Sequence, residues 1–322
     1  MKSFILVSVL LVLFLGVELV VWDQRRSKNV TQKDCRCSIL PTGSYPIPGL
    51  VALPEKDCWR QVQLEDRAKK NTAKWHKFSG PLFLTKKTAP GVISKVMSEP
   101  VVKRFNTCAV VASGGIMLTQ EFGREIDKHD TVIRMNNAPT IGYERFVGSK
   151  SSVRISFPPY CGSFIGASSE EADILCVRAV EPHLQNMWAT AIPFVKMVDT
   201  GHDGVIEVLK HHNLRKEAWK PKQLLAFSVP FNSYLQKWTK SPSTGFAAVV
   251  YALHVCNETT LYGFSNGLDL GEDVSQIPYH YFSDIGGAWL KKHTHHAHHM
   301  DREMEFILSW HSKGMLKLRH VC

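Results

Sequence analysis

Short apolar runs alternate with amphipathic segments along the C-terminal two thirds of the chain. The apolar runs occupy residues 108–112, 131–134, 152–155, 173–177 and 224–227. Such runs are typical of strands that are buried on both faces of a parallel sheet. Segments with helical periodicity occupy residues 204–214, 231–240, 244–256 and 301–312. This alternation predicts a doubly wound α/β fold with a mostly parallel central sheet flanked by helices.

The first residues follow a different pattern. Residues 4–22 are apolar except for Glu18, and a helix of this length just crosses a bilayer. A cleaved signal peptide is the alternative, but no small residues typical of a cleavage site follow the stretch. We therefore expect a short cytoplasmic tail at residues 1–3 and a transmembrane signal anchor at residues 4–22. Residues 23–90 are basic and rich in proline, which is typical of a solvated stem.

Charge and cysteine content give opposite indications of the topology. Lys2 precedes the apolar stretch and three basic residues at 25–28 follow it, so the positive-inside rule favours a cytosolic body. Eight cysteines without zinc-site spacing, together with glycosylation sequons at Asn29 and Asn257, instead indicate an oxidising lumen. We expect a lumenal body with disulfides, and buried free thiols in a cytosolic protein are the alternative.

The overall composition is that of a globular protein. Hydrophobic residues make up 44% of the chain and charged residues 21%, which excludes a wholly disordered chain and a protein with many membrane spans. The formal net charge of +10 indicates an anionic partner. Nucleic acid, a membrane surface, a nucleotide and an acidic sugar all remain possible on charge alone.

Two turns and one histidine cluster are candidates for chemistry. The strand at 108–112 leads into Ser113 and two glycines, a turn that either approaches a phosphate or simply connects a strand to a helix. Ser243, Thr244 and Gly245 begin a helix that is apolar nearly all round, so its N-terminus is either a buried anion site or a plain helix cap. Five histidines at 293–299 include an i, i+4 pair, but no third ligand completes a metal site and the chain has no DxD motif.

Read together, these segments closely resemble the four motifs of the eukaryotic sialyltransferases, glycosyltransferase family 29. Residues 108–152 resemble the long motif, 241–264 the short motif, 279–282 the third motif and 298–303 the very short motif. The resemblance implies a single-pass type II membrane enzyme of the Golgi apparatus. It also implies a lumenal catalytic domain at residues 91–322 with a GT-A-like, Rossmann-like variant of the α/β fold.

The resemblance also implies a branch of the family. The residues around Lys103 and the ending at Cys322 look most like the α2,8-sialyltransferases, which act on sialylated glycans. Phe122 stands where those enzymes have a cysteine, and Ser265 stands where they have a tryptophan. Ser113 replaces the asparagine of most members and resembles some α2,6-acting enzymes, so an α2,6 linkage to N-acetylgalactosamine or galactose is the alternative. A catalytically silent glycan-binding protein of the Golgi is the alternative from another class.

The implied reaction is transfer of sialic acid from CMP-sialic acid to a glycoprotein or glycolipid glycan with inversion. It needs neither a metal nor another cofactor, and we expect no nucleic-acid partner. By its place in the motifs His298 is the general base, and His280 is the hydrogen-bond donor to the CMP phosphate. The donor-binding positions are Ser113, Asn136, Ser243, Thr244 and Gly245. The resemblance further implies a disulfide between Cys108 and Cys256.

Overall fold

The computed structural model describes residues 36–38, 50–52, 55–83, 104–156, 174–177, 223–264, 279–282 and 298–319. The predicted tail and anchor, the sequon at Asn29, the predicted helix at 204–214 and the histidines at 293–296 lie outside these ranges. Within the described ranges, the structure contains no helix that is both long enough and apolar enough to span a membrane.

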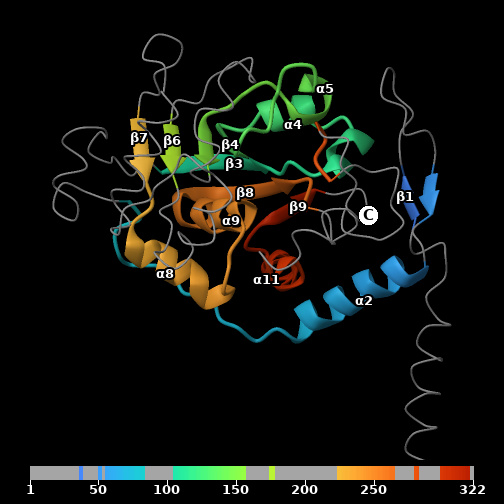
Figure 1. Cartoon of the computed structure of the whole chain (residues 1–322), viewed down its shortest axis with the longest axis horizontal. Coiled ribbons are helices and arrows are strands. Elements are labelled where there is room, and N and C mark those ends of the chain that lie inside the picture. The colour runs from blue at the N-terminus through green and yellow to red at the C-terminus, as the bar shows by residue number, and fades with distance from the viewer. Residues whose placement is uncertain are drawn as a thin grey trace, which may run out of the picture.

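A seven-stranded sheet forms the centre of the molecule (Figure 1). In spatial order its strands are β7 (Gln223–Ala226), β6 (Ile174–Val177), β5 (Val153–Ser156), β4 (Thr131–Met135), β3 (Phe105–Val111), β8 (Cys256–Tyr262) and β9 (Lys317–Arg319). Every neighbouring pair is parallel. From β3 the chain adds β4 to β7 on one side and then returns to add β8 and β9 on the other. The predicted doubly wound parallel sheet is confirmed, and β8 and β9 are additional strands that the hydrophobic pattern did not predict.

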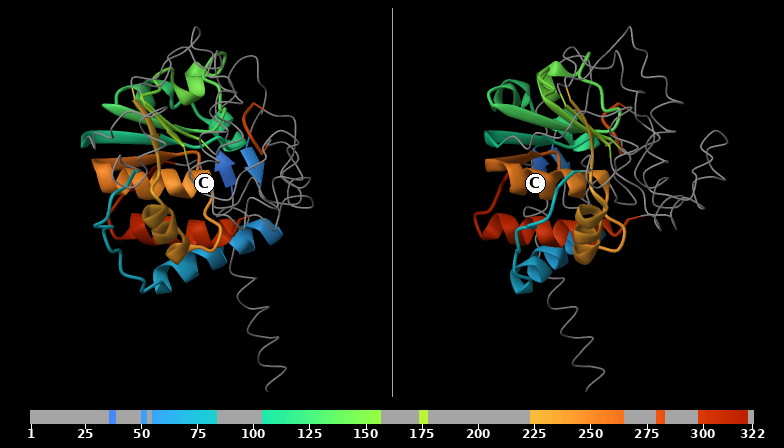
Figure 2. Two further views of the ribbon diagram at one scale, coloured as in Figure 1. Left: turned by 60° about the vertical axis from the view of Figure 1, so that its left-hand side comes forward. Right: turned by 90° about the vertical axis from the view of Figure 1, so that its left-hand side faces the viewer.

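Helices cover both faces of this sheet (Figures 1 and 2). The short helices η2 (Gly115–Thr119), α4 (Gly123–Asp127) and α5 (Glu144–Val147) lie on one face. On the other face α9 (Thr244–Val255) packs on the sheet, with α8 (Val229–Trp238) and α11 (Met300–Ser312) outside it. Because α9 lies between the sheet and these outer helices, all its sides are buried, which explains why it is apolar nearly all round.

Part of the predicted stem belongs to the folded body. Helix α2 (Glu55–Lys70) packs along α11, and its Leu64 is fully buried. Further along, Trp75 lies against the rings of Trp238 and Trp310, and Phe83 is paired with Phe227 at the end of β7. The solvated linker expected over these residues is therefore packed structure, because its few large apolar side chains bury themselves against α8, α9 and α11. A separate antiparallel pair, β1 (Arg36–Ser38) and β2 (Leu50–Ala52), precedes α2.

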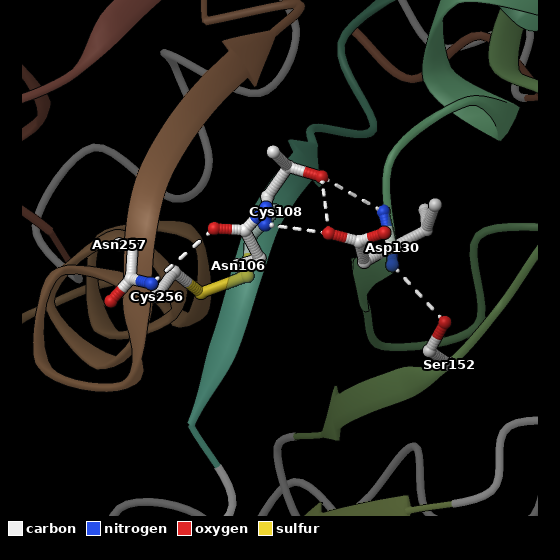
Figure 3. Close-up of a disulfide and its surroundings, with 8 residues drawn as sticks. Asn106, Cys108, Asp130, Ser152, Cys256 and Asn257 are labelled. Atoms are coloured by element: carbon white, nitrogen blue, oxygen red, sulfur yellow. Dashed lines mark hydrogen bonds between the residues drawn. A yellow bond between two sulfur atoms is a disulfide. The ribbon is translucent and has the colours of Figure 1, made fainter.

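The disulfide that the family resemblance implies is present (Figure 3). It joins Cys108 in β3 to Cys256 at the start of β8, with 6.1 Å between the two Cα atoms. These strands are neighbours in the sheet, and the bond links two segments that are 148 residues apart in the sequence. The exposed Asn257 lies beside it, and its side-chain amide donates to Asn106 Oδ1 over 3.3 Å. The candidate glycosylation sequon is thus at the amino end of β8, on the surface.

Candidate active site

The strand order places a topological switch point at the carboxyl ends of β3 and β8. The connections leave these two neighbouring strands in opposite directions, and ligands of doubly wound proteins bind at such a switch point. The last hydrogen bond between the two strands runs from Ala112 N to Tyr262 O over 2.8 Å. Beyond it the chain turns away at Ser113 on one side and at Phe264 on the other.

The turn at Ser113 holds the segment that carries His280. Gly114 and His280 form an antiparallel bridge, Gly115 N donates to Tyr279 O, and Tyr281 N donates to Ser113 O. Ser113 and His280, 167 positions apart in the sequence, are thereby brought together. The glycine turn that the sequence suggested as a phosphate loop is, in this structure, also the support of the third motif.

The ring of His280 has a defined orientation and protonation state. Its Nδ1 lies 3.3 Å from Ser113 O, and since a carbonyl only accepts, Nδ1 carries the hydrogen. The ring of Phe282 stacks on it with a centroid distance of 5.1 Å, and the ring of Tyr279 lies 4.4 Å away. Burial lowers the pKa of His280 below its ordinary value, an effect that the hydrogen bond to Ser113 partly offsets. The unliganded ring is therefore neutral at pH 7, with its lone pair on Nε2.

The N-terminus of α9 is the candidate anion site that the sequence suggested. Ser243 caps the helix, and its Oγ accepts from Phe246 N over 3.0 Å. Thr244 and Gly245 follow in the first turn, where backbone N–H groups point out of the helix and the helix dipole favours negative charge. A Cβ atom added at Gly245 would lie 3.6 Å from the ring of Phe264, so the helix start borders the end of β8.

A buried glutamate holds this helix start in place. Glu303 is 4% exposed, and its two carboxylate oxygens accept from Ser243 N over 2.7 Å and from Ser243 Oγ over 2.5 Å. Both hydrogen-bonding hydrogens of Ser243 are therefore donated to Glu303. Of the three predicted donor-binding residues in this turn, Ser243 has a structural role as the cap, and Thr244 and Gly245 supply the N–H groups of the first turn.

His298 is placed by the same pair of helices. It precedes α11, is partly buried, and its Nδ1 donates to Ser241 O over 3.0 Å. This bond puts the lone pair of the neutral ring on Nε2, the arrangement that a general base needs. Because Glu303 in the first turn of α11 binds Ser243, the start of α11 is attached to the start of α9 at two points. His299, next in sequence, is exposed.

Asn136 is presented at the same edge of the sheet by the turn after β4. It has a φ of +48°, a left-handed conformation that asparagine tolerates better than most residues. Its N–H donates to Ile155 O over 2.9 Å. The hydroxyl of Tyr281 donates to Pro139 O, which connects this turn to the His280 segment. All the predicted catalytic and donor-binding residues thus lie on segments that meet at the carboxyl edge.

Two residues of this edge received no role from sequence reasoning. Glu303 was recognised only as part of a motif, and Arg154 only as part of an apolar strand. Each is a charged residue at a buried position of its element, which is the signal that could have identified them. Among the described side chains no group of three or more metal-binding residues occurs, and metal independence remains a prediction.

The fold places the chain in the class of doubly wound α/β proteins, whose ligands bind at a switch point of the sheet. The model of glycosyltransferase family 29, the sialyltransferases, matches residues 60–315, and the chain belongs to this family. This confirms the family that the motifs indicated, and the match begins inside the predicted stem.

Individual relatives are distant in sequence. The chain is 30% identical over 214 residues to the CMP-N-acetylneuraminate-beta-1,4-galactoside alpha-2,3-sialyltransferase of Mus musculus, covering 62% of this chain and 54% of that protein. It is 26% identical over 271 residues to the beta-galactosamide alpha-2,3-sialyltransferase 1 of the same species, covering 83% and 73%. The chain thus spans about half the length of the first of these relatives. Both names specify an α2,3 linkage, so they give no support to the α2,8 branch.

Among solved structures, a crystal structure of a mammalian sialyltransferase in complex with Gal-beta-1-3GalNAc-ortho-nitrophenol aligns with a TM-score of 0.45 and 19% identity, over 91% of this chain and 92% of that one.

Proposed function

We propose that this protein is a sialyltransferase that moves sialic acid from CMP-sialic acid to a hydroxyl group of a glycan, with inversion and without a metal. The observation that carries the proposal is the convergence, in a family 29 chain, of two oriented histidines and a helix N-terminus at one edge of the sheet. The reaction must remove a proton from the acceptor and stabilise the negative charge of the departing phosphate, and these groups can do both.

In the proposed mechanism, Nε2 of His298 takes the proton of the acceptor hydroxyl as its oxygen attacks the anomeric carbon of sialic acid. The bond from that carbon to the CMP phosphate breaks on the opposite face, which gives inversion. The N-terminus of α9 and His280 stabilise the departing phosphate, with His280 in its protonated form, and Asn136 and Ser113 contact the nucleotide. CMP leaves as a phosphate monoester, so no divalent cation is required in this scheme.

We propose α2,3 as the first linkage to test, because the relatives reported above are named for α2,3 transfer to galactosides. The alternatives are the α2,8 linkage to sialylated glycans, which the sequence motifs favoured, and the α2,6 linkage, which Ser113 suggested. We further propose that residues 4–22 anchor the enzyme in the Golgi membrane with a short tail at residues 1–3. The body would then be lumenal, with Asn257 and Asn29 available for glycosylation.

The test is an assay of CMP release with CMP-sialic acid and an array of galactoside, N-acetylgalactosaminide and sialylated acceptors, followed by linkage analysis of the product. Acceptor-dependent CMP release that persists in EDTA supports the proposal. Glycan binding without CMP release would instead support a silent glycan-binding protein, the alternative that rests on Ser113 in place of the usual asparagine and on Ser265 in place of tryptophan.

A further inference from the structure

Two arginines lie side by side inside the molecule, on the face of the sheet covered by α4 and α5. Arg134 in β4 and Arg154 in β5 are register partners, and each is 1% exposed. A buried guanidinium is costly unless its N–H groups are hydrogen-bonded. Both side chains donate to backbone carbonyls, but they do so at opposite ends of the sheet.

Arg134 holds the loop that leads into β5. Its Nη2 donates to the carbonyls of Val147, Gly148 and Lys150 over 2.7–3.1 Å, and its Nε also donates to Lys150. This loop precedes the amino end of β5, and the candidate site lies at the carboxyl ends of the strands.

Arg154 holds the turn that follows β4. Its Nη1 donates to Asn136 O over 2.9 Å and to Ala138 O over 3.0 Å. Burial and the neighbouring Arg134 lower the pKa of Arg154 to about 9, so the guanidinium is still charged at neutral pH. Charge-assisted hydrogen bonds are stronger than neutral ones. The two bonds from Arg154 fix the carbonyl groups of Asn136 and Ala138 in a turn whose first residue, Asn136, has a left-handed backbone conformation.

The same turn is connected to the rest of the candidate site. The hydroxyl of Tyr281 donates to Pro139 O, and its backbone N–H donates to Ser113 O. His280 precedes Tyr281 and contacts the same Ser113 carbonyl. A continuous set of hydrogen bonds therefore leads from Arg154 through residues 136–139 to the turn at Ser113.

We propose that Arg154 is a positioning residue for donor binding: its guanidinium holds residues 136–139 in the conformation that presents Asn136 to the nucleotide. This inference rests on the proposed function and adds a residue to it. Arg134 has the same burial and the same kind of hydrogen bonds, but those bonds go to the loop before β5, so it is the matched structural control.

The experiment compares Arg154→Lys with Arg134→Lys in the full chain. Lysine keeps the charge but lacks the planar fork that reaches two carbonyls. We expect Arg154→Lys to weaken CMP binding, measured by calorimetry, by about tenfold or more, because small displacements of binding groups are costly. The KM for CMP-sialic acid should rise in parallel, with kcat at saturating donor nearly unchanged. Arg134→Lys should lower the melting temperature to a similar degree and leave CMP affinity unchanged.

A double-mutant cycle separates positioning from a general loss of stability. If Arg154 acts through Asn136, Arg154→Lys should weaken CMP binding much less in an Asn136→Ala background than in the wild type. Should Arg154→Lys fail to fold, Tyr281→Phe tests the same turn, since it removes the hydrogen bond to Pro139, and weaker CMP binding is again expected.

Unchanged CMP affinity in Arg154→Lys would overturn the inference, as would unchanged affinity in Tyr281→Phe if Arg154→Lys does not fold. An equal loss of CMP affinity in Arg134→Lys would also overturn it. So would additive effects of Arg154→Lys and Asn136→Ala on CMP affinity. Wild-type protein that binds no CMP would overturn the proposed function and this inference with it. If the wild type binds CMP and Arg154→Lys binds it equally tightly, this inference alone is overturned.

Discussion

His298 and His299 are adjacent in the sequence but have different surroundings. His298 is partly buried with Nδ1 bonded to Ser241 O, and His299 is exposed. Only the first has the fixed tautomer that proton abstraction from an acceptor requires. The difference is local to the few residues before α11, where the chain is tied to the start of α9.

His298→Ala should therefore lower turnover by on the order of 10²-fold or more, the usual contribution of a general base, and leave CMP affinity unchanged. His299→Ala is the control and should retain nearly full turnover. Steady-state kinetics and calorimetry with CMP measure the two effects. Equal losses in both variants would remove His298 from the role of base.

His280 should make CMP binding depend on pH. Its Nδ1 donates to Ser113 O, so Nε2 can donate to a phosphate only when the ring is charged. Because burial lowers the pKa of the unliganded ring, binding above that pKa takes up a proton. The affinity contributed by His280 should be highest below this pKa and fall as pH rises, by at most about tenfold per pH unit, until the pKa of the complex is passed.

The measurement is the CMP dissociation constant between pH 5 and 8 for the wild type and for His280→Gln. The phosphate of CMP also titrates, with a second pKa of about 6 like that of other phosphate monoesters. The pH dependence that remains in His280→Gln measures the contribution of this phosphate. Parallel curves for the two proteins would show that His280 stays neutral in the complex.

At the scale of elements, α9 carries the proposed anion site at its first turn. Gly245 does not have a positive φ, so its backbone conformation is open to other residues. An added Cβ would make only ordinary contacts of 3.6 Å with Phe264 and Ser243. The protein itself therefore tolerates a methyl group at this position. A phosphate that approaches the helix N-terminus closely would not.

Gly245→Ala should leave the free energy of unfolding unchanged or raise it by up to about 1 kcal/mol, since alanine favours a helix more than glycine does. CMP affinity should fall sharply in the same variant. Urea unfolding and CMP titration test the two parts separately. Undiminished CMP binding would mean that the ligand does not approach this turn.

His254, near the end of the same helix, attaches residues 71–83 to the body. Its Nδ1 donates to Val250 O over 2.7 Å, and its Nε2 accepts from Phe78 N over 2.8 Å. Protonation of Nε2 would remove the second bond. Burial lowers the pKa of His254, the hydrogen bond to Val250 raises it in part, and the charge of Lys77 lowers it further.

Because the pKa is lower in the folded state, the stabilisation is fully present above the unfolded value near 6.5 and is lost as pH falls through the folded pKa. The free energy of unfolding should decrease below pH 6.5 by at most about 1.4 kcal/mol per pH unit from this group. Urea unfolding at several pH values tests this, and His254→Gln should reduce the slope. An identical slope in the variant would assign the acid sensitivity to other groups.

For the whole molecule, the bond between Cys108 and Cys256 joins the middle of β3 to the amino end of the neighbouring strand β8. The two cysteines are 148 residues apart in the sequence, so the bond closes a long loop. Replacing both cysteines by serine should destabilise the fold by about 2–5 kcal/mol, chiefly because the unfolded chain gains freedom.

The candidate site is at the carboxyl ends of the same strands, away from this bond, so CMP affinity of the folded double variant should match that of the wild type. Chemical unfolding and calorimetry give the two numbers. A large loss of CMP affinity in protein that is still folded would contradict the separation of the two edges.

The hydrophobic pattern was sufficient to predict β3 to β7, α8, α9 and α11, because buried parallel strands and an enclosed helix need apolar residues throughout. It did not predict β8, whose second and third residues are polar and exposed although the strand lies inside the sheet. It did not predict β9 either, a three-residue edge strand with only Leu318 buried. In both, the neighbouring strand and not the local sequence determines the conformation.

The motifs alone identified the family and the candidate residues, because chemistry requires particular side chains at particular positions. Only the tertiary structure decided what these residues do to one another: that Glu303 holds the cap of α9, that Ser113 orients His280, and that Arg154 lies beneath the turn of Asn136. Hydrogen bonds between residues far apart in sequence depend on strand order and register. Local sequence contains neither, so these assignments follow only from the folded chain.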